Sequence, residues 1–138
     1  MENLPDYIAN HPWLVSMAAV AALLVIVFEV KVRRDAFAGV SAQDLIRLQN
    51  QGALVIDLRK AEEFSQGHIP EAINIDVMSE YFTADISTLD KNCNYAIYCR
   101  SGKRSVDAAT IMDESGFETT NLLGGIISWV ESGQPVTS

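Results

Sequence analysis

The residues best suited to chemistry lie in one short segment that begins at Cys99. Residues 99–105 read Cys-Arg-Ser-Gly-Lys-Arg-Ser and follow an apolar run at 95–98. Three of the ten lysines and arginines of the chain fall in this segment, and no acid does. Cationic neighbours and the N-terminus of a following helix favour thiolate over thiol. We therefore predict a lowered pKa for Cys99 and a role as a nucleophile towards sulfur or phosphorus.

The same segment is suited to holding an anion beside that nucleophile. Gly102 permits backbone conformations that a side chain would forbid, so successive N–H groups can converge on one negative group. Cationic side chains add charge-assisted attraction. The substrate-binding residues predicted here are Arg100, Ser101, Gly102, Lys103 and Arg104.

Each cysteine also has an alternative interpretation. For Cys99 it is an inert, buried position at a strand end, which is common for cysteine, although the cationic residues that follow argue against it. Cys93 lies between two asparagines, with Lys91 as its nearest base. We interpret Cys93 as structural, and a resolving disulfide with Cys99 is the alternative.

A strand must precede Cys99 and a helix must follow it. Residues 39–138 alternate short apolar runs with helical patterns, which predicts an α/β fold with a mainly parallel sheet flanked by helices. Reactive groups in such sheets lie beyond the carboxyl ends of the strands. Strands are predicted at 53–56, 72–75, 95–98 and 119–123, and helices at 41–49, 104–115 and 126–132, while residues 78–89 carry mixed signals. The apolar stripe predicted for the second of these helices is Val106, Ala109, Ile111 and Met112.

An apolar segment precedes this domain. From Trp13 to Phe28 sixteen residues carry no charge, and Val30 extends the segment to eighteen, at the short end for a spanning helix (about 17–25 residues). Bases are absent from residues 1–12, and three occur in residues 31–34. By the positive-inside rule, we expect a single-pass protein of the inner (cytoplasmic) membrane with its C-terminal domain in the cytoplasm. The predicted organisation is a non-cytoplasmic segment at 1–12, a transmembrane helix at 13–30, a basic linker at 31–38 and the domain at 39–138.

The apolar segment has two alternatives to a permanent anchor. A cleaved signal peptide is favoured by Ala36-Phe37-Ala38, which fits an A-x-A site, but the bases follow the apolar run instead of preceding it. A buried helix of a soluble protein is disfavoured because sixteen uncharged positions leave no polar face.

Length and composition narrow the function classes. A chain of 138 residues has room for one soluble domain, and 49% hydrophobic residues exclude a disordered protein. A net charge of −8 argues against nucleic acid as a partner. Two cysteines are too few for a disulfide-stapled miniprotein.

Several segments resemble the rhodanese-like single-domain sulfurtransferases. Asp57-Leu58-Arg59 followed by Glu63-Phe64 is similar to the family's D-V-R-x-x-x-E-Y run. Residues 67–75 are similar to its G-H-I-P-G-A-I-N-I segment, with Glu71 where glycine is usual. Residues 99–105 resemble its catalytic loop, and Gly116-Phe117, then Gly124-Gly125-Ile126 with Trp129, resemble its closing elements. The order and spacing of these segments over about residues 39–136 make the resemblance specific.

The resemblance implies a thiosulfate sulfurtransferase of the rhodanese type that needs no cofactor. The Cys99 thiolate would take the outer sulfur atom of thiosulfate or of a protein persulfide and pass it to a thiol or cyanide. The implied partners are a small anionic sulfur donor or a protein persulfide, a thiol acceptor and, through residues 13–30, membrane lipid. A membrane protein partner is left open. The oligomeric state is open too, because alanines at 18, 19, 21 and 22 permit close helix packing.

Two other functions stay open. One is a membrane-tethered binding or scaffold module with little turnover. The other is a cysteine-dependent phosphatase or arsenate reductase. Related phosphatases place five residues between cysteine and arginine, whereas four separate Cys99 from Arg104. The shorter loop suits a sulfur atom better than a tetrahedral phosphate.

The remaining matched residues are interpreted as structural support. Asp57 is expected to accept hydrogen bonds from nearby backbone, and His68 to satisfy backbone groups in a turn. Arg59 and Glu63 are expected to pair, since they lie four positions apart.

Trp129 is expected in the core. No metal site is predicted, because neither the two histidines nor the two cysteines have the spacing of metal ligands.

Overall fold

The chain forms two compact units, residues 1–36 and residues 37–138. The computed structural model describes residue 8, residues 11–36 and residues 39–138. Most of the N-terminal segment predicted at 1–12, and residues 37–38 of the predicted linker and its A-x-A motif, lie outside the described residues.

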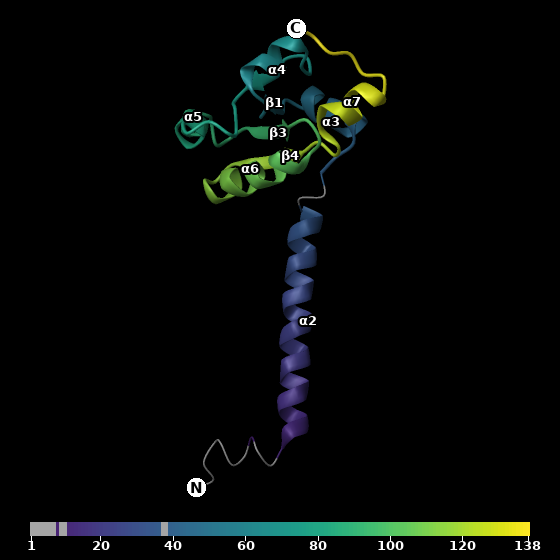
Figure 1. The fold of residues 1–138 in the computed structure, drawn as a ribbon, viewed down its shortest axis with the longest axis vertical. Coiled ribbons are helices and arrows are strands. Elements are labelled where there is room, and N and C mark those ends of the chain that lie inside the picture. The colour runs from purple at the N-terminus through teal and green to yellow at the C-terminus, as the bar shows by residue number, and fades with distance from the viewer. Residues whose placement is uncertain (1–7, 9–10, 37–38) are drawn as a thin grey trace. The chain divides into compact units, whose positions relative to one another are not determined.

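Helix α2 (Pro12–Ala36) makes up most of the described part of the first unit (Figure 1). Its stretch Pro12–Lys31 has a mean hydropathy of 2.4, and none of it is buried. The helix is therefore long and apolar enough to cross a membrane, and a signal sequence near the N-terminus would share these properties. It continues beyond Val30, the predicted end, because residues 31–36 contain neither proline nor glycine to interrupt it.

The second unit is built on a four-stranded sheet in the order β2-β1-β3-β4. Its strands are β1 (Leu54–Asp57), β2 (Ile73–Asn74), β3 (Asn94–Tyr98) and β4 (Glu118–Asn121). Every pairing within it is parallel, which confirms the predicted fold class. The central strands β1 and β3 are continuous apolar runs because helices cover both faces of the sheet.

The edge strands are shorter than predicted. The strand expected at 72–75 pairs only at residues 73–74, and the strand expected at 119–123 ends at Asn121. Leu122 continues only as an isolated bridge with Val40. The prediction extended the strand too far because Leu122 is apolar, but it fills the core beyond the last paired residue.

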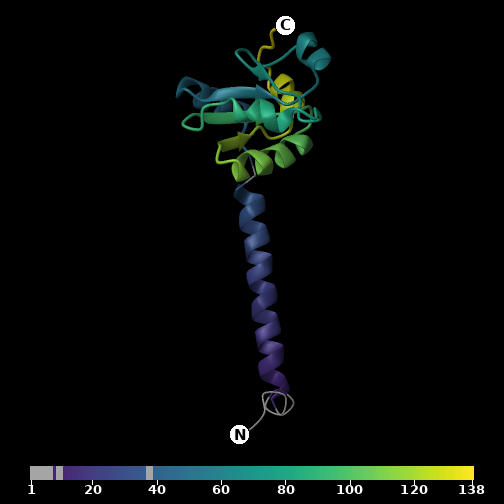
Figure 2. The same cartoon turned by 90° about the vertical axis from the view of Figure 1, so that its left-hand side faces the viewer.

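Five helices surround the sheet in the described residues (Figure 1, Figure 2): α3 (Ala42–Asn50), α4 (Ala61–Gln66), α5 (Phe82–Ser87), α6 (Lys103–Glu114) and α7 (Gly125–Glu131). The Ser41 hydroxyl accepts a hydrogen bond from the Asp44 N–H at 3.2 Å, as the capping pattern at the start of α3 predicted. Helices α4 and α5 were not predicted as separate elements, because six residues are too few to show a helical period.

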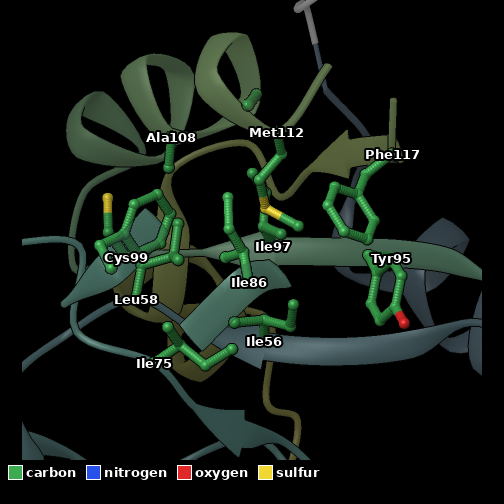
Figure 3. Packing of buried hydrophobic residues seen from close by; sticks show 12 residues of the cluster. Ile56, Leu58, Ile75, Ile86, Tyr95, Ile97, Cys99, Ala108, Met112 and Phe117 are labelled. Carbon is green, nitrogen blue, oxygen red and sulfur yellow. The ribbon is translucent and has the colours of Figure 1, made fainter. Parts of the chain in front are cut away.

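Two clusters of buried side chains lie on opposite faces of the sheet. One gathers residues of α5 and α6 with Ile56, Ile97 and Cys99 (Figure 3). The other gathers residues of α3 and α7 with Val55 and Tyr98. Because side chains alternate along a strand, Ile97 and Cys99 of one cluster flank Tyr98 of the other.

The buried stripe of α6 differs from the prediction. Ala109 and Met112 are buried as expected, but Val106 and Ile111 are 36% and 38% exposed. The buried positions are 105, 108, 109 and 112. These follow the i, i+3, i+4, i+7 spacing of one helical face, which Val106 and Ile111 do not share.

Candidate functional site

Cys99 directly follows the last residue of β3, at the carboxyl end of the sheet. Its side chain points to the same side as Ile97, towards α6, and only 2% of the residue is exposed. Figure 3 shows it at the edge of the cluster that contains Ala108 and Met112. The structure thus places the predicted nucleophile where a strand passes into a helix, as the sequence indicated.

The sulfur of Cys99 is contacted by polar groups from the loop that follows it. The Gly102 N–H donates a hydrogen bond to Sγ at 3.1 Å. The Ser105 Oγ lies 3.6 Å from Sγ and itself donates to the Gly102 carbonyl at 3.1 Å. A serine hydroxyl can rotate, so Ser105 can accept from the thiol and donate to the thiolate.

Two opposing influences set the pKa of Cys99. Burial is the largest and on its own would raise the pKa of the thiol. Hydrogen bonds from Ser105 and from the backbone N–H groups of residues 101 and 102 outweigh it, so the pKa of Cys99 is lowered. The direction agrees with the prediction. The lowering comes from these local donors, which include Ser105 in the first turn of the following helix. The sequence prediction had named the N-terminus of that helix together with the cationic side chains.

The conformation of the loop depends on two glycines. Gly102 adopts the left-handed region with a φ of 89° and forms the N-cap of α6. Gly125 has a φ of 60°, and a Cβ there would overlap the carbonyl oxygens of Cys99 and Arg100. Those two positions therefore allow the loop and the start of α7 to approach each other.

Backbone hydrogen bonds join α7 to the loop at this point of close approach. The Ile126 N–H donates to the Cys99 carbonyl at 3.0 Å, and the Ile127 N–H donates to the Arg100 carbonyl at 3.3 Å. The first turn of α7 thus holds the main chain at Cys99 in place.

Cys99 lines a pocket of about 360 Å³. Three of the five residues predicted to bind substrate, Arg100, Ser101 and Arg104, line it too. Gly102 and Lys103 are not part of its wall, since Gly102 contributes its N–H to the sulfur and Lys103 is exposed at the start of α6. The far wall consists of residues that were not predicted to line it: Lys60, Glu62 and Glu63.

A buried ion pair supports the ends of β1 and β3. Asp57 is fully buried and binds the guanidinium of Arg59, with Oδ2 2.6 Å from Nη2. The Tyr98 hydroxyl donates to the same Oδ2 at 2.7 Å and accepts from the Ile69 N–H at 3.1 Å. Burial is the main reason that the pKa of Tyr98 is raised, and the neighbouring Asp57 carboxylate raises it further.

The predicted pairing of Arg59 with Glu63 is wrong. Arg59 binds Asp57 and the Gly67 carbonyl, the latter at 2.7 Å. Glu63 instead accepts a hydrogen bond from the Lys60 N–H at the start of α4. The helical i, i+4 argument failed because Arg59 precedes α4, and its side chain turns back to the strand end.

The other supporting residues lie as expected. Asp57 accepts a hydrogen bond from the Arg59 N–H at 2.9 Å. The His68 Nδ1 lies 2.9 Å from the Phe64 carbonyl, and the two rings stack with centroids 3.7 Å apart. Trp129 is 2% exposed and belongs to the core. Cys93 is half-buried, and both cysteines are free thiols.

Three residues at the site were missed by the sequence reasoning. Tyr98 had been interpreted only as part of an apolar strand, although a tyrosine next to the nucleophile needs a partner for its hydroxyl. Ser105 closed the predicted loop but was given no role. Gly125 was noted only as part of a motif, because nothing local shows that it packs against residues 99–100.

The arrangement of a strand-end cysteine, a cationic loop and a long helix corresponds to a known family. Residues 41–132 match the rhodanese-like domain. The chain belongs to the rhodanese-like domain family.

Sulfurtransferases of this family are similar to the chain over most of the second unit. A sulfurtransferase from Allochromatium vinosum is 34% identical over 89 residues, covering 64% of this chain and 81% of the relative. The thiosulfate sulfurtransferase PspE of Escherichia coli is 32% identical over 71 residues, covering 51% and 68%. The crystal structure of a rhodanese-related protein from Thermoplasma volcanium matches with a TM-score of 0.66 at 30% identity, covering 72% and 96%. These rhodanese-like relatives support sulfurtransferase activity at the level of the family.

Proposed function

We propose that the chain is a membrane-anchored sulfurtransferase in which Cys99 carries the transferred sulfur atom. The observation that carries this proposal is the environment of the Cys99 sulfur, which accepts the Gly102 N–H at 3.1 Å. It lines a pocket whose wall includes the cations Arg100 and Arg104. A sulfur with a lowered pKa beside cations is suited to attack an anionic sulfur donor.

In the first step the Cys99 thiolate attacks the outer sulfur atom of thiosulfate. The bond between Cys99 Sγ and that sulfur forms, and the sulfur–sulfur bond of thiosulfate breaks. Sulfite leaves with the electron pair, and Cys99 is left as a persulfide anion. No proton has to move and no external oxidant is required.

In the second step an acceptor thiolate or cyanide attacks the terminal sulfur of the persulfide. The sulfur–sulfur bond breaks, and Cys99 leaves as the thiolate with which the cycle began. The products are a persulfide of the acceptor thiol or, from cyanide, thiocyanate. Because both halves pass through the same covalent species, ping-pong kinetics are expected.

The other residues of the loop have two roles, attraction of the donor and stabilisation of negative charge on the sulfur. Arg100 and Arg104 attract the anionic donor, and Lys103 adds positive charge at the start of α6. Ser101, Gly102 and Ser105 direct donors towards the sulfur and thereby stabilise the negative charge of thiolate and persulfide.

Helix α2 would serve as a single-pass anchor. Its apolar stretch and the three bases that follow support an orientation with the sulfurtransferase domain in the cytoplasm, where low-pKa thiols stay reduced.

The decisive assay measures thiocyanate formation from thiosulfate and cyanide by the full chain in detergent. We expect ping-pong kinetics and a loss of turnover of about a thousandfold or more in Cys99→Ser. Cys93→Ser is the matched control and should retain activity. Hydrolysis of an aryl phosphate by the wild type, lost in Cys99→Ser and without sulfur transfer, would instead favour the phosphatase alternative.

A further inference from the structure

A second and larger pocket adjoins the one that holds Cys99. It has a volume of about 580 Å³, and Glu63 and Arg100 line both pockets. The two pockets therefore share a boundary. We call the larger pocket, which extends along α7, the groove. The first step of the proposed reaction needs only the smaller pocket, since thiosulfate is a small anion.

One wall of the groove is apolar and exposed. Ile127 and Val130 of α7 are 43% and 53% exposed, and Val136 is 47% exposed. Ile127 and Val130 lie one helical turn apart, about 5 Å along the axis. The wall begins at the catalytic loop, because the Ile127 N–H donates to the Arg100 carbonyl.

The groove is held in shape by contacts behind its surface. The indole N–H of Trp129 donates to the Pro135 carbonyl at 2.8 Å. His68, two residues after α4, and Thr137 exchange two backbone hydrogen bonds of 2.8 and 2.9 Å. Val136 is therefore held on one side through Pro135 and on the other through Thr137. A preformed apolar surface of this kind favours binding because little ordering is needed.

Besides the ion-paired Arg59, one cation and two carboxylates line the groove. Arg100 stands at the end next to Cys99, whereas Arg59 is neutralised by its ion pair with Asp57. Glu63 lies at the same end, and the carboxylate of Glu131 lines the groove on α7. The groove therefore complements an occupant that is apolar and carries a positive charge.

We propose that the groove binds the sulfur acceptor, and that this acceptor is a protein segment with an apolar residue and then a basic residue within about three positions of its cysteine. This inference rests on the proposed function. The acceptor thiolate would reach the persulfide on Cys99 while the apolar side chain packs on Ile127 and Val130. Cyanide needs no such surface, and glutathione would leave the apolar wall uncovered and place its carboxylates near Glu63 and Glu131.

Transfer to synthetic peptides tests the proposal with the full chain in detergent. The probes are a Cys-Leu-Leu-Lys peptide, a Cys-Ser-Ser-Lys peptide and a Cys-Leu-Leu-Glu peptide, each compared with cyanide. We expect the first to be the best acceptor. In Ile127→Ser/Val130→Ser, the ratio of its kcat/KM to that of cyanide should fall about tenfold or more.

The matched control is Ile111→Ser on α6, which removes a similarly exposed apolar side chain outside the groove. It should leave the ratio unchanged. Glu131→Gln should lower transfer to the lysine peptide more than to the glutamate peptide. Equal transfer to all three peptides, an unaltered ratio in the groove variant, or an effect of that variant only on self-association of the chain would overturn the proposal.

Binding separates this inference from the proposed function. A fluorescent Ser-Leu-Leu-Lys peptide should bind Cys99→Ser, and Ile127→Ser/Val130→Ser should weaken that binding about tenfold. If no persulfide forms but the peptide binds in this way, the peptide-binding role of the groove is supported and the proposed sulfur transfer is contradicted. If a persulfide forms and the peptide does not bind, the groove assignment fails alone.

Discussion

Two effects on the ionisation of Cys99 oppose each other: burial of the sulfur disfavours its charged form, and the hydrogen-bond donors around it favour that form. The donors prevail, so the reactivity of this residue depends on the position of the backbone at residues 101–102 and on Ser105. In the proposed reaction, the exposed cations Arg100 and Arg104 would attract the anionic sulfur donor into the pocket.

The pH dependence of alkylation follows from the lowered pKa of Cys99. Thiolate is the reactive form, and a lowered pKa means that it appears at lower pH than in free cysteine. The rate of alkylation at Cys99 should therefore reach its midpoint below that of a cysteine in an unfolded peptide. In Ser105→Ala the midpoint should move to higher pH, because a group that lowers the pKa is removed.

Ser115→Ala, at the other end of α6, is the control and should leave the midpoint unchanged. An unchanged midpoint in Ser105→Ala would show that the hydroxyl does not assist ionisation.

The hydroxyl of Tyr98 joins Asp57 to the backbone at Ile69. Tyr98→Phe would leave a buried carboxylate with one donor fewer and the Ile69 N–H without its acceptor. We expect a loss of about 1–3 kcal/mol in the free energy of unfolding, measured with urea in detergent. Tyr81→Phe is the matched control, because Tyr81 is 63% exposed. Equal effects of the two substitutions would contradict the assigned role.

At the scale of elements, the site depends on the contact between the loop before α6 and the first turn of α7. Two backbone hydrogen bonds cross this contact, and Gly125 permits it. The element that holds Cys99 in place therefore lies more than twenty positions later in the chain.

Gly125→Ala should displace the loop, because its Cβ would overlap the carbonyls of Cys99 and Arg100. We expect persulfide formation with thiosulfate to fall about tenfold or more. Gly133→Ala is the control: its φ is also positive, at 80°, but a Cβ there meets nothing within 4 Å. Similar activities of the two variants would contradict the role assigned to the close contact at Gly125.

The parallel sheet, the central strands and the loop at Cys99 could be predicted because each depends on residues close in sequence. Continuous apolar runs mark β1 and β3, and a glycine with cations marks the loop. Asp57 and His68 also make the local contacts that were expected.

The remaining features depend on residues far apart. The pairing of Arg59 with Asp57 instead of Glu63 follows from where the strand ends, and the partner of Tyr98 lies 41 positions away. The groove is lined by residues of α7, the C-terminal segment and the end of α4, so no local sequence pattern predicts it.

At the scale of the whole molecule, a chain with a net charge of −8 concentrates three cations in one loop. The anionic donor of the proposed reaction would therefore be attracted to the site and repelled elsewhere. The apolar helix α2 adds a second property, because tethering would confine transfer to acceptors near a membrane.

A permanent anchor and a cleaved signal peptide predict different masses for the mature protein. If α2 is a permanent anchor, the purified protein has the intact mass of 15.1 kDa and stays in the membrane fraction after an alkaline wash. Substitution of Lys31, Arg33 and Arg34 by glutamine should then reduce the fraction with a protease-protected, cytoplasmic C-terminus. A mature chain that begins after residue 38 would show that the segment is a cleaved signal.

The central claim is tested most directly by the intact mass of the full chain after exposure to thiosulfate. We expect a gain of one sulfur atom, about 32 Da, located on Cys99, reversed by cyanide and absent from Cys99→Ser. No gain in the wild type, or the same gain in Cys99→Ser, would contradict the claim that this sulfur carries the transferred atom.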